Sequence, residues 1–228
     1  MLLIAYWLIL KGQVMSQLDT SIIIRPFKDI DFDEVVNLCV RKWCSDITGA
    51  YDRIIFGRVL TAGALQRSVY TMVAEENGSV IGVCFGGLSS NRSISQNSFW
   101  HRRFEDIMVI ARDRARRGGV KVEDRLFSRL RSYTTADVFI SLGYANSEAE
   151  INLLIVDPNH MGKGVGSRLF DDMTTRFKDA GARGFFLIVS SESDIDFFEH
   201  RGLNCIQEKQ GTSGDRGNSV IYLYGRRL

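Results

Sequence analysis

The stretch VDPNHMGKGVGSRLF, residues 156–170, decides the fold, because it connects a buried strand to an amphipathic helix. The apolar run INLLIV at 151–156 leads into it and is typical of a strand covered on both faces. After the turn, apolar residues recur at helical spacing, at Val165, Leu169, Met173 and Phe177. Gly181 can end that helix. The sequence therefore predicts a strand, a tight turn and a helix.

The turn itself carries three alternating glycines, Gly162, Gly164 and Gly166. Without side chains the backbone can approach a ligand closely, and N–H groups at the start of a helix can face an anion. A diphosphate is the natural candidate. The motif is not a P-loop, since Lys163 is followed by glycine, and it is not a dinucleotide fingerprint, since Ser167 stands at the third glycine position.

The segments before this motif predict a strand, two helices and a hairpin. Residues 21–26 form a short apolar run typical of a first strand. Apolar residues between Phe32 and Trp43 recur at helical spacing, and Asp29 or Asp31 can cap that helix. The remaining elements are a helix at 51–68, a hairpin at 70–88 around an Asn-Gly turn, a strand at 184–189, a short helix at 193–203 and a final strand at 219–224.

A basic segment at about 91–146 interrupts this order. Residues 91–133 hold eleven Lys or Arg and five Asp or Glu. Two helical stripes separated by Gly118-Gly119 predict a helical insertion, and their apolar residues are Phe104, Ile107, Met108 and Ala111, then Leu126, Phe127 and Leu130. The charged faces are either simply solvated or form a lid or wall of a substrate site.

Residues 1–14 are interpreted separately from the domain at 15–228. The opening run MLLIAYWLIL is about half the length that spans a bilayer. It has no preceding basic residue and no small-residue cleavage site, so it is a poor signal peptide. We expect an optional extension or an over-long start, and the alternative is an apolar strand or helix packed on the body.

The composition predicts a globular, cytoplasmic protein of one domain. The 228 residues are 45% apolar and 25% charged, with a formal net charge of +2, which excludes a disordered chain and a polytopic membrane protein. A near-neutral charge makes nucleic-acid binding unlikely. The four cysteines (Cys39, Cys44, Cys84 and Cys205) form no CxxC pair and predict reduced thiols without a metal site. We expect no membrane partner, and the sequence leaves a homodimer open.

Around the glycine turn the sequence resembles the GCN5-related N-acetyltransferase (GNAT) family, whose strand ends in Val-x-Pro before a glycine-rich helix start and a later Phe-Tyr-x-x-x-Gly-Phe helix. The residues that fall on this pattern are Val156, Pro158, Gly162, Gly164, Gly166, Phe197 and Gly202. The resemblance covers roughly residues 20–90 and 147–228. It implies an α/β fold with a mixed, mostly antiparallel sheet and helices on both faces.

The resemblance also implies a reaction, the direct transfer of an acetyl group from acetyl-CoA to a primary amine of a small molecule or protein. The pantetheine arm would pair with Leu154, Ile155 and Val156. The diphosphate would lie on the turn formed by Met161, Gly162, Lys163, Gly164, Val165, Gly166 and Ser167. Glu150 stands where family members often place the general base, and Glu148 is the next candidate.

Four positions depart from the family pattern. Met161 replaces an Arg or Gln, Ser191 stands where many members have an Asn that contacts pantetheine, and Leu203 replaces a Phe. Phe198 replaces the usual Tyr, which removes a proton donor for the departing thiolate. The loss of this donor favours an alternative function, a non-catalytic acyl-CoA sensor. A third interpretation is a nucleic-acid or ribosome-associated module that uses the basic insertion.

Overall fold

The computed structural model describes residues 22–88, 98–118, 134, 137–138, 141–142, 148–190, 193–210 and 220–228. Within these ranges seven strands form one sheet in the order β1-β2-β3-β4-β5-β7-β6. Neighbouring strands are antiparallel except for β4 and β5, which run parallel. The predicted mixed, mostly antiparallel sheet is confirmed.

The strands and helices follow the sequence periodicity closely. The strands are β1 (Ile22–Pro26), β2 (Tyr70–Glu76), β3 (Ser79–Leu88), β4 (Ala149–Val156), β5 (Gly184–Ser190), β6 (Asn204–Gln210) and β7 (Val220–Arg227). The helices are α2 (Phe32–Trp43), α3 (Ala50–Gln66), α4 (Ser98–Gly118), α6 (Val165–Asp179) and α7 (Ile195–Glu199), with short 3-10 turns η1 (Asp29–Asp31) and η3 (Pro158–His160). The sequence analysis missed β6 and placed the ends of α7 too far apart.

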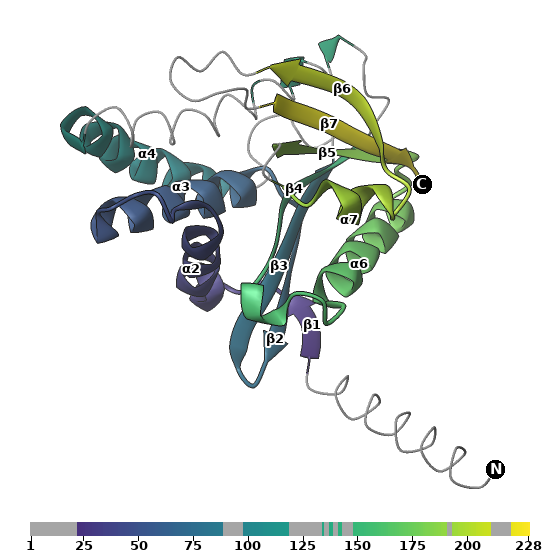
Figure 1. Ribbon diagram of the computed structural model, residues 1–228, viewed down its shortest axis with the longest axis horizontal. Helices are drawn as coiled ribbons and strands as arrows, with labels where there is room; N and C mark the ends of the chain where they lie inside the picture. The colour runs from purple at the N-terminus through teal and green to yellow at the C-terminus, as the bar shows by residue number, and fades with distance from the viewer. Residues whose placement is uncertain are drawn as a thin grey trace, which may run out of the picture.

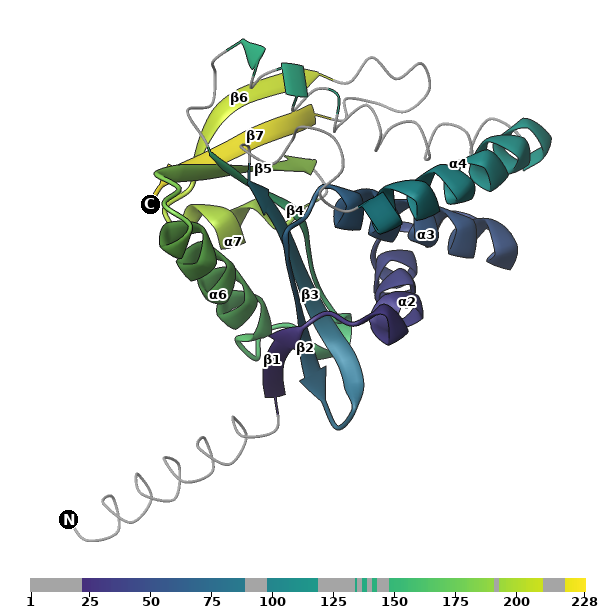
Figure 2. The same ribbon diagram turned by 180° about the vertical axis from the view of Figure 1, so that it is seen from behind.

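Helices cover both faces of the sheet, as Figures 1 and 2 show. On one side α2, α3 and α4 enclose a first apolar core, and on the other α6 packs over a second. Side chains of β3 alternate between them, because Val83 and Phe85 enter the first core and Cys84 enters the second. The sheet is therefore buried on both faces at its centre, as the apolar strands predict.

The parallel pair β4 and β5 separates early. It is paired only from Ala149 opposite Phe185 to Ile151 opposite Leu187. The register between β3 and β4 also shifts here, since Phe85 faces Leu153 whereas Gly86 faces Ile151. Asn152 is thus the extra residue of a β-bulge at the point where the two strands part.

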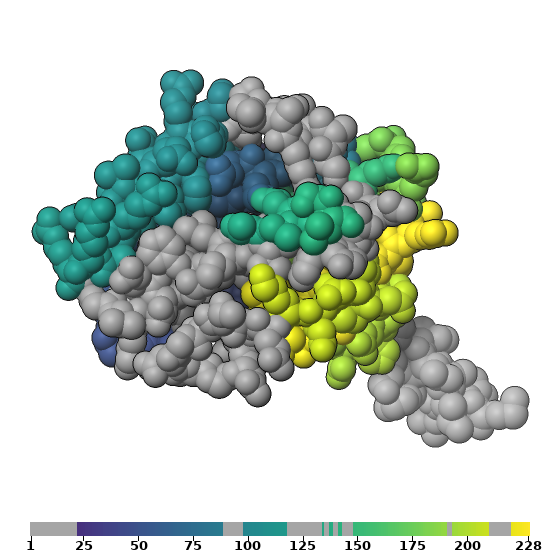
Figure 3. Space-filling view, turned by 90° about the horizontal axis from the view of Figure 1, so that it is seen from above, coloured from purple at the N-terminus to yellow at the C-terminus, as the bar shows by residue number. Residues whose placement is uncertain are grey.

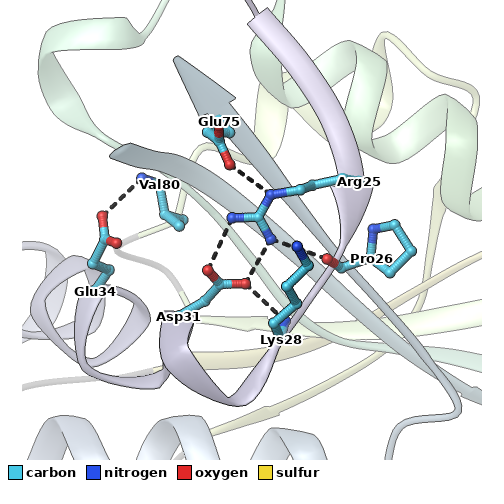
Figure 4. A network of polar contacts seen from close by, with 7 residues as sticks. All are labelled: Arg25, Pro26, Lys28, Asp31, Glu34, Glu75 and Val80. Atoms are coloured by element: carbon cyan, nitrogen blue, oxygen red, sulfur yellow. Dashed lines mark hydrogen bonds and ion pairs between the residues drawn. The ribbon is translucent and has the colours of Figure 1, made fainter. Parts of the chain in front are cut away.

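A buried ion pair fixes the first strand to the helix that follows it (Figure 4). The Arg25 guanidinium donates to both carboxylate oxygens of Asp31, at 2.7 and 2.9 Å, and to Glu75 of β2 at 2.6 Å. Asp31 is only 2% exposed. It is the N-cap residue of α2, as expected, but its side chain caps no N–H of that helix and binds Arg25 instead.

The longest described part of the basic insertion is α4, which lies on the opposite side of the molecule from β6 and β7 (Figure 3). Its predicted apolar stripe is buried and packs with α3 in the first core. One arginine, Arg114, pairs at 2.5 Å with Asp52, which is buried in the first turn of α3. The second predicted helix, around residues 126–130, and the N-terminal residues 1–14 lie outside the described residues.

Candidate functional site

A cavity of about 140 Å³ opens between β4 and β5, where the two strands part. Its floor and walls come from β4, β5, α7, the glycine turn and the end of α2. The lining residues are Lys42, Trp43, Ile151, Asn152, Leu153, Leu154, Ile155, Val156, Met161, Gly166, Leu187, Ile188, Val189, Ser193, Asp194, Phe197 and Phe198. The site therefore combines an extended strand edge, a helix start and two aromatic rings.

The strand edge is the first feature of this site. Beyond Ile151, no described strand pairs with the side of β4 that faces β5. Leu154, Ile155 and Val156 lie along this open edge and line the cavity. An unpaired strand edge presents N–H and C=O groups that an extended amide can bind.

The glycine turn forms one end of the cavity, and two of its three glycines have a backbone conformation that favours glycine. Gly162 and Gly164 have φ angles of +75° and +79°, in the left-handed region that favours glycine. A side chain on either would meet no atom within 4 Å. At Gly166, by contrast, a Cβ would lie 3.4 Å from Phe197 and Val156. Backbone geometry, and not only close approach by a ligand, therefore explains the first two glycines.

The first turn of α6 begins at this point. Gly164 is the N-cap residue, so no side chain caps the helix. The first N–H groups of a helix lack intrahelical acceptors, and their partial positive charge favours an anion. A turn and helix start suited to a phosphate group is thus formed by Met161, Gly162, Lys163, Gly164, Val165, Gly166 and Ser167.

A guanidinium lies beside this helix start. Arg201 donates to the Ser167 hydroxyl oxygen and, at 3.3 Å, to the backbone oxygen of Phe197. Its guanidinium carbon stands 3.9 Å from the centre of the Phe197 ring, which is a cation–π contact. The sequence analysis did not single out Arg201, because the contact with Ser167 joins residues 34 positions apart.

A charged network ties the turn to α2 and β2. Asp157 binds Arg41 at 2.7 Å and accepts the backbone N–H of Asn159 at 2.9 Å. His160 approaches Asp157 at 3.6 Å and Glu76 at 3.0 Å. Partial burial alone would raise the pKa of Asp157, but the Asn159 N–H, Arg41 and His160 together lower it. The residues that lead into the glycine turn are therefore held by ion pairs with α2 and β2.

The candidate base Glu150 is 5% exposed and pairs with Arg67 at 3.1 Å. Arg67 also binds Asp137 at 2.8 Å. Burial alone would lower the pKa of Arg67, but the carboxylates of Glu150 and Asp137 raise it above its ordinary value. Glu150 is not one of the residues that line the cavity, although the next residue, Ile151, is.

The second candidate, Glu148, lies away from the cavity. It forms an exposed pair with Arg183 at 2.5 Å and accepts the Arg183 backbone N–H at 2.9 Å. These contacts lower the pKa of the Glu148 carboxyl. Glu148 therefore links the residues that directly precede β4 and β5.

Several residues of the cavity wall were not anticipated from the sequence. Lys42 and Trp43 reach it from the end of α2, and Ser193 and Asp194 reach it from the start of α7. Asn152 is the most informative, because it is a buried polar residue in a run otherwise made of apolar side chains. Phe198 lines the cavity at the position discussed above, whereas Ser191 lies outside the described residues.

Metal ligands, membrane-spanning helices and cysteines can be stated for the described residues. No group of three or more His, Cys, Asp or Glu side chains gathers there as a metal site would. No helix in this part of the chain is long and apolar enough to cross a membrane. Cys39, Cys44 and Cys84 are buried and Cys205 is exposed, and burial raises the pKa of the Cys84 thiol well above its ordinary value.

Solved structures share this fold at low sequence identity. Ard1 from Thermoplasma volcanium is 18% identical, with a TM-score of 0.53 over 91% of this chain and 98% of that one. A polyamine N-acetyltransferase of Drosophila melanogaster that forms N-acetylagmatine is 16% identical, with a TM-score of 0.54 over 91% and 100%. The ribosomal-protein-S18-alanine N-acetyltransferase of Escherichia coli is 11% identical, with a TM-score of 0.52 over 90% and 93%.

Sequence comparison gives the family more directly. No curated protein sequence matches this chain significantly. The model of the acetyltransferase (GNAT) family matches residues 40–203, which run from α2 through the glycine turn to the end of the α7 segment. Since that match spans most of the chain and includes the turn and the cavity described above, the chain belongs to the acetyltransferase (GNAT) family.

Proposed function

We propose that this protein is an acetyl-CoA-dependent N-acetyltransferase that transfers an acetyl group directly to a primary amine. One observation carries the proposal. The cavity between β4 and β5 joins an unpaired strand edge to an uncapped helix start that favours an anion. Acetyl-CoA has the matching parts in the same order, namely a thioester, an extended arm with amides and a diphosphate.

In this proposal the cofactor extends along β4. The amides of pantetheine bind the backbone of Leu154, Ile155 and Val156. The diphosphate accepts N–H groups from the turn between Met161 and Ser167, and Arg201 adds a positive charge beside Ser167. A backbone N–H of β4 polarises the thioester carbonyl, as oxyanion donors do.

The chemical step needs a neutral amine, because an ammonium group has no lone pair. Glu150 removes the proton from the incoming ammonium, and it does so through water, because Glu150 is not one of the residues that line the cavity. The amine nitrogen then attacks the thioester carbon, the new C–N bond forms and the C–S bond breaks. The nitrogen, which is cationic after the attack, releases its second proton to solvent, so that a neutral amide is formed. CoA leaves as a thiolate and takes its proton from solvent, because the Phe198 ring offers none.

A second candidate function is a sensor that binds acyl-CoA without turnover. The observation that favours it is the hydrocarbon ring of Phe198 in the cavity wall, where the family pattern has a hydroxyl. A thiol of ordinary pKa, about 8.5, can leave largely without protonation near neutral pH. The missing hydroxyl therefore weakens catalysis without removing it, and we retain the enzyme as the main proposal.

The test combines a binding and a turnover measurement. Calorimetry with acetyl-CoA and with CoA gives the affinity of the cleft. Release of CoA is then followed with a panel of amines that includes agmatine, lysine and a peptide that begins with alanine. Binding with amine-dependent CoA release supports the enzyme, and binding without release for any amine supports the sensor. If acetyl-CoA does not bind, both proposals are wrong.

A further inference from the structure

We infer that Asn152 positions the attacking amine, through a hydrogen bond from the amine N–H to the side-chain oxygen Oδ1. The inference rests on the proposed function and extends it to a residue that recognises the acceptor. The inference depends on three features of Asn152. Its side-chain amide has a fixed orientation, its side-chain oxygen has no donor among the described residues, and the residue lies where β4 and β5 part.

The orientation of the amide is determined by its neighbours. Nδ2 donates to the backbone oxygen of Arg67 at 3.3 Å and to the Ser68 hydroxyl oxygen at 3.0 Å. The Ser68 hydroxyl donates its own hydrogen to the backbone oxygen of Ala64 at 2.7 Å, so it can only accept from Asn152. A flipped amide would place Oδ1 against two acceptors. The oxygen therefore has to point away from Arg67 and Ser68.

The backbone of β3 makes this arrangement possible. A Cβ at Gly87 would lie 2.2 Å from the Arg67 backbone oxygen and 3.4 Å from Asn152 Nδ2. Any other residue at position 87 would displace the carbonyl that holds the amide. The end of α3, β3 and the bulge of β4 thus form one rigid support for Asn152.

The oxygen itself has no hydrogen-bond donor in the described part of the chain, and it is closed to solvent. Asn152 is 5% exposed and lines the cavity. A buried acceptor without a donor is destabilising, and such groups are rare in folded proteins. Because Asn152 lines the cavity, we assign the missing donor to a molecule bound there, which a small shift of the side chain would bring into contact with Oδ1.

The position of Asn152 selects the amine over the cofactor as that donor. Asn152 is the first residue of β4 beyond the pairing with β5, and it precedes the edge assigned to pantetheine. Its side chain and that of Glu150 contact the same residue, Arg67. Arg67 therefore holds both residues, Glu150 through its guanidinium and Asn152 through its backbone oxygen. An amine that gives one proton to Glu150 keeps another N–H for Oδ1.

The experiment uses two CoA derivatives and needs no knowledge of the natural acceptor. In one probe the sulfur of CoA carries CH₂–C(=O)–NH–ethyl, and in the other it carries CH₂–C(=O)–O–ethyl. They differ in a single N–H group, at the position of the transferred amine. We expect the native chain to bind the amide roughly three- to tenfold more tightly than the ester, as one net hydrogen bond allows. Asn152→Leu should bind the two probes equally.

Ser68→Ala is the matched control, because it removes the same Ser68–Asn152 hydrogen bond and leaves Oδ1 and the Arg67 carbonyl in place. Ser68→Ala should keep the preference for the amide probe. If the role of Asn152 were purely structural, Ser68→Ala and Asn152→Leu would be expected to change probe binding in the same way. Asn152→Ala replaces the leucine variant if the latter does not fold. A native chain without preference, or a preference that survives in both Asn152 variants, overturns the inference. Failure of acetyl-CoA and both probes to bind overturns the proposed function itself.

Discussion

The substitution Glu150→Gln tests proton removal from the acceptor with little change in structure. Glutamine keeps the size of the side chain and an oxygen that can accept from Arg67, which binds Glu150 at 3.1 Å. We therefore expect the variant to fold and to bind acetyl-CoA like the native chain. Its kcat/KM for the amine should fall roughly 10²-fold at pH 7, within the usual range for the loss of a general base.

The loss of kcat/KM in Glu150→Gln should become smaller as the pH rises. An amine with a pKa like that of lysine, about 10.4, is neutral in only about one molecule of 2,500 at pH 7. The neutral fraction rises about a hundredfold between pH 7 and pH 9. A variant without its base depends on that fraction alone, so its deficit should shrink to less than about tenfold at pH 9.

The assay is the initial rate of CoA release between pH 6.5 and 9, at saturating acetyl-CoA. Glu148→Gln is the matched control, because it makes the same chemical change two residues earlier, at an exposed ion pair with Arg183. Its kcat/KM should stay within about twofold of the native value, as is usual for an exposed pair. If the Glu150→Gln profile runs parallel to the native one, Glu150 is not the base.

Three further results are expected. Phe198→Tyr should change kcat by less than about tenfold, and an inactive native chain that becomes active with this change would instead be a degenerate enzyme. Asp31→Ala should lower the free energy of unfolding by about 2 kcal/mol in urea, because it removes two charge-assisted hydrogen bonds of Arg25 while Glu75 still binds that guanidinium. Burial alone would raise the pKa of Asp31, but Arg25 lowers it. The ion pair therefore stabilises the folded state above about pH 4, and this stabilisation is lost on acidification. The Asp31→Ala variant should lack this acid-sensitive part of the free energy of unfolding. Gly164→Asn should fold normally, since asparagine tolerates a φ of +79°, and should bind CoA at least about tenfold more weakly in calorimetry; unchanged affinity would refute the phosphate turn.

The strand, turn and helix around residues 151–181 could be predicted because each depends on local periodicity. The same reasoning located the buried stripe of α4, but it could not show what covers that stripe. Only the structure shows that α4 packs on α3 and contributes no residue to the cavity wall. Arg103 lies over the rings of Phe32 and Trp100, so at least part of the basic character of this helix serves packing.

At the glycine turn the sequence gives only part of the reason for the glycines. Alternation at Gly162, Gly164 and Gly166 indicated an anion site, on the argument that side chains would block it. The structure adds that two of these residues are left-handed and would favour glycine without any ligand. A valine at Gly164 would therefore disturb the fold as well as binding, and this is why asparagine is the better test at that position.

The environment of Glu150 could not be predicted, because its partners are distant in the sequence. The Glu150–Arg67 contact joins residues 83 positions apart, and the Asn152–Ser68 contact joins residues 84 positions apart. The sequence did contain one signal, a single asparagine in the apolar run INLLIV. A buried asparagine in such a run is destabilising unless both ends of its amide are satisfied. Here one end is held by the fold and the other is not, which is the pattern expected of a residue retained for what enters the cavity.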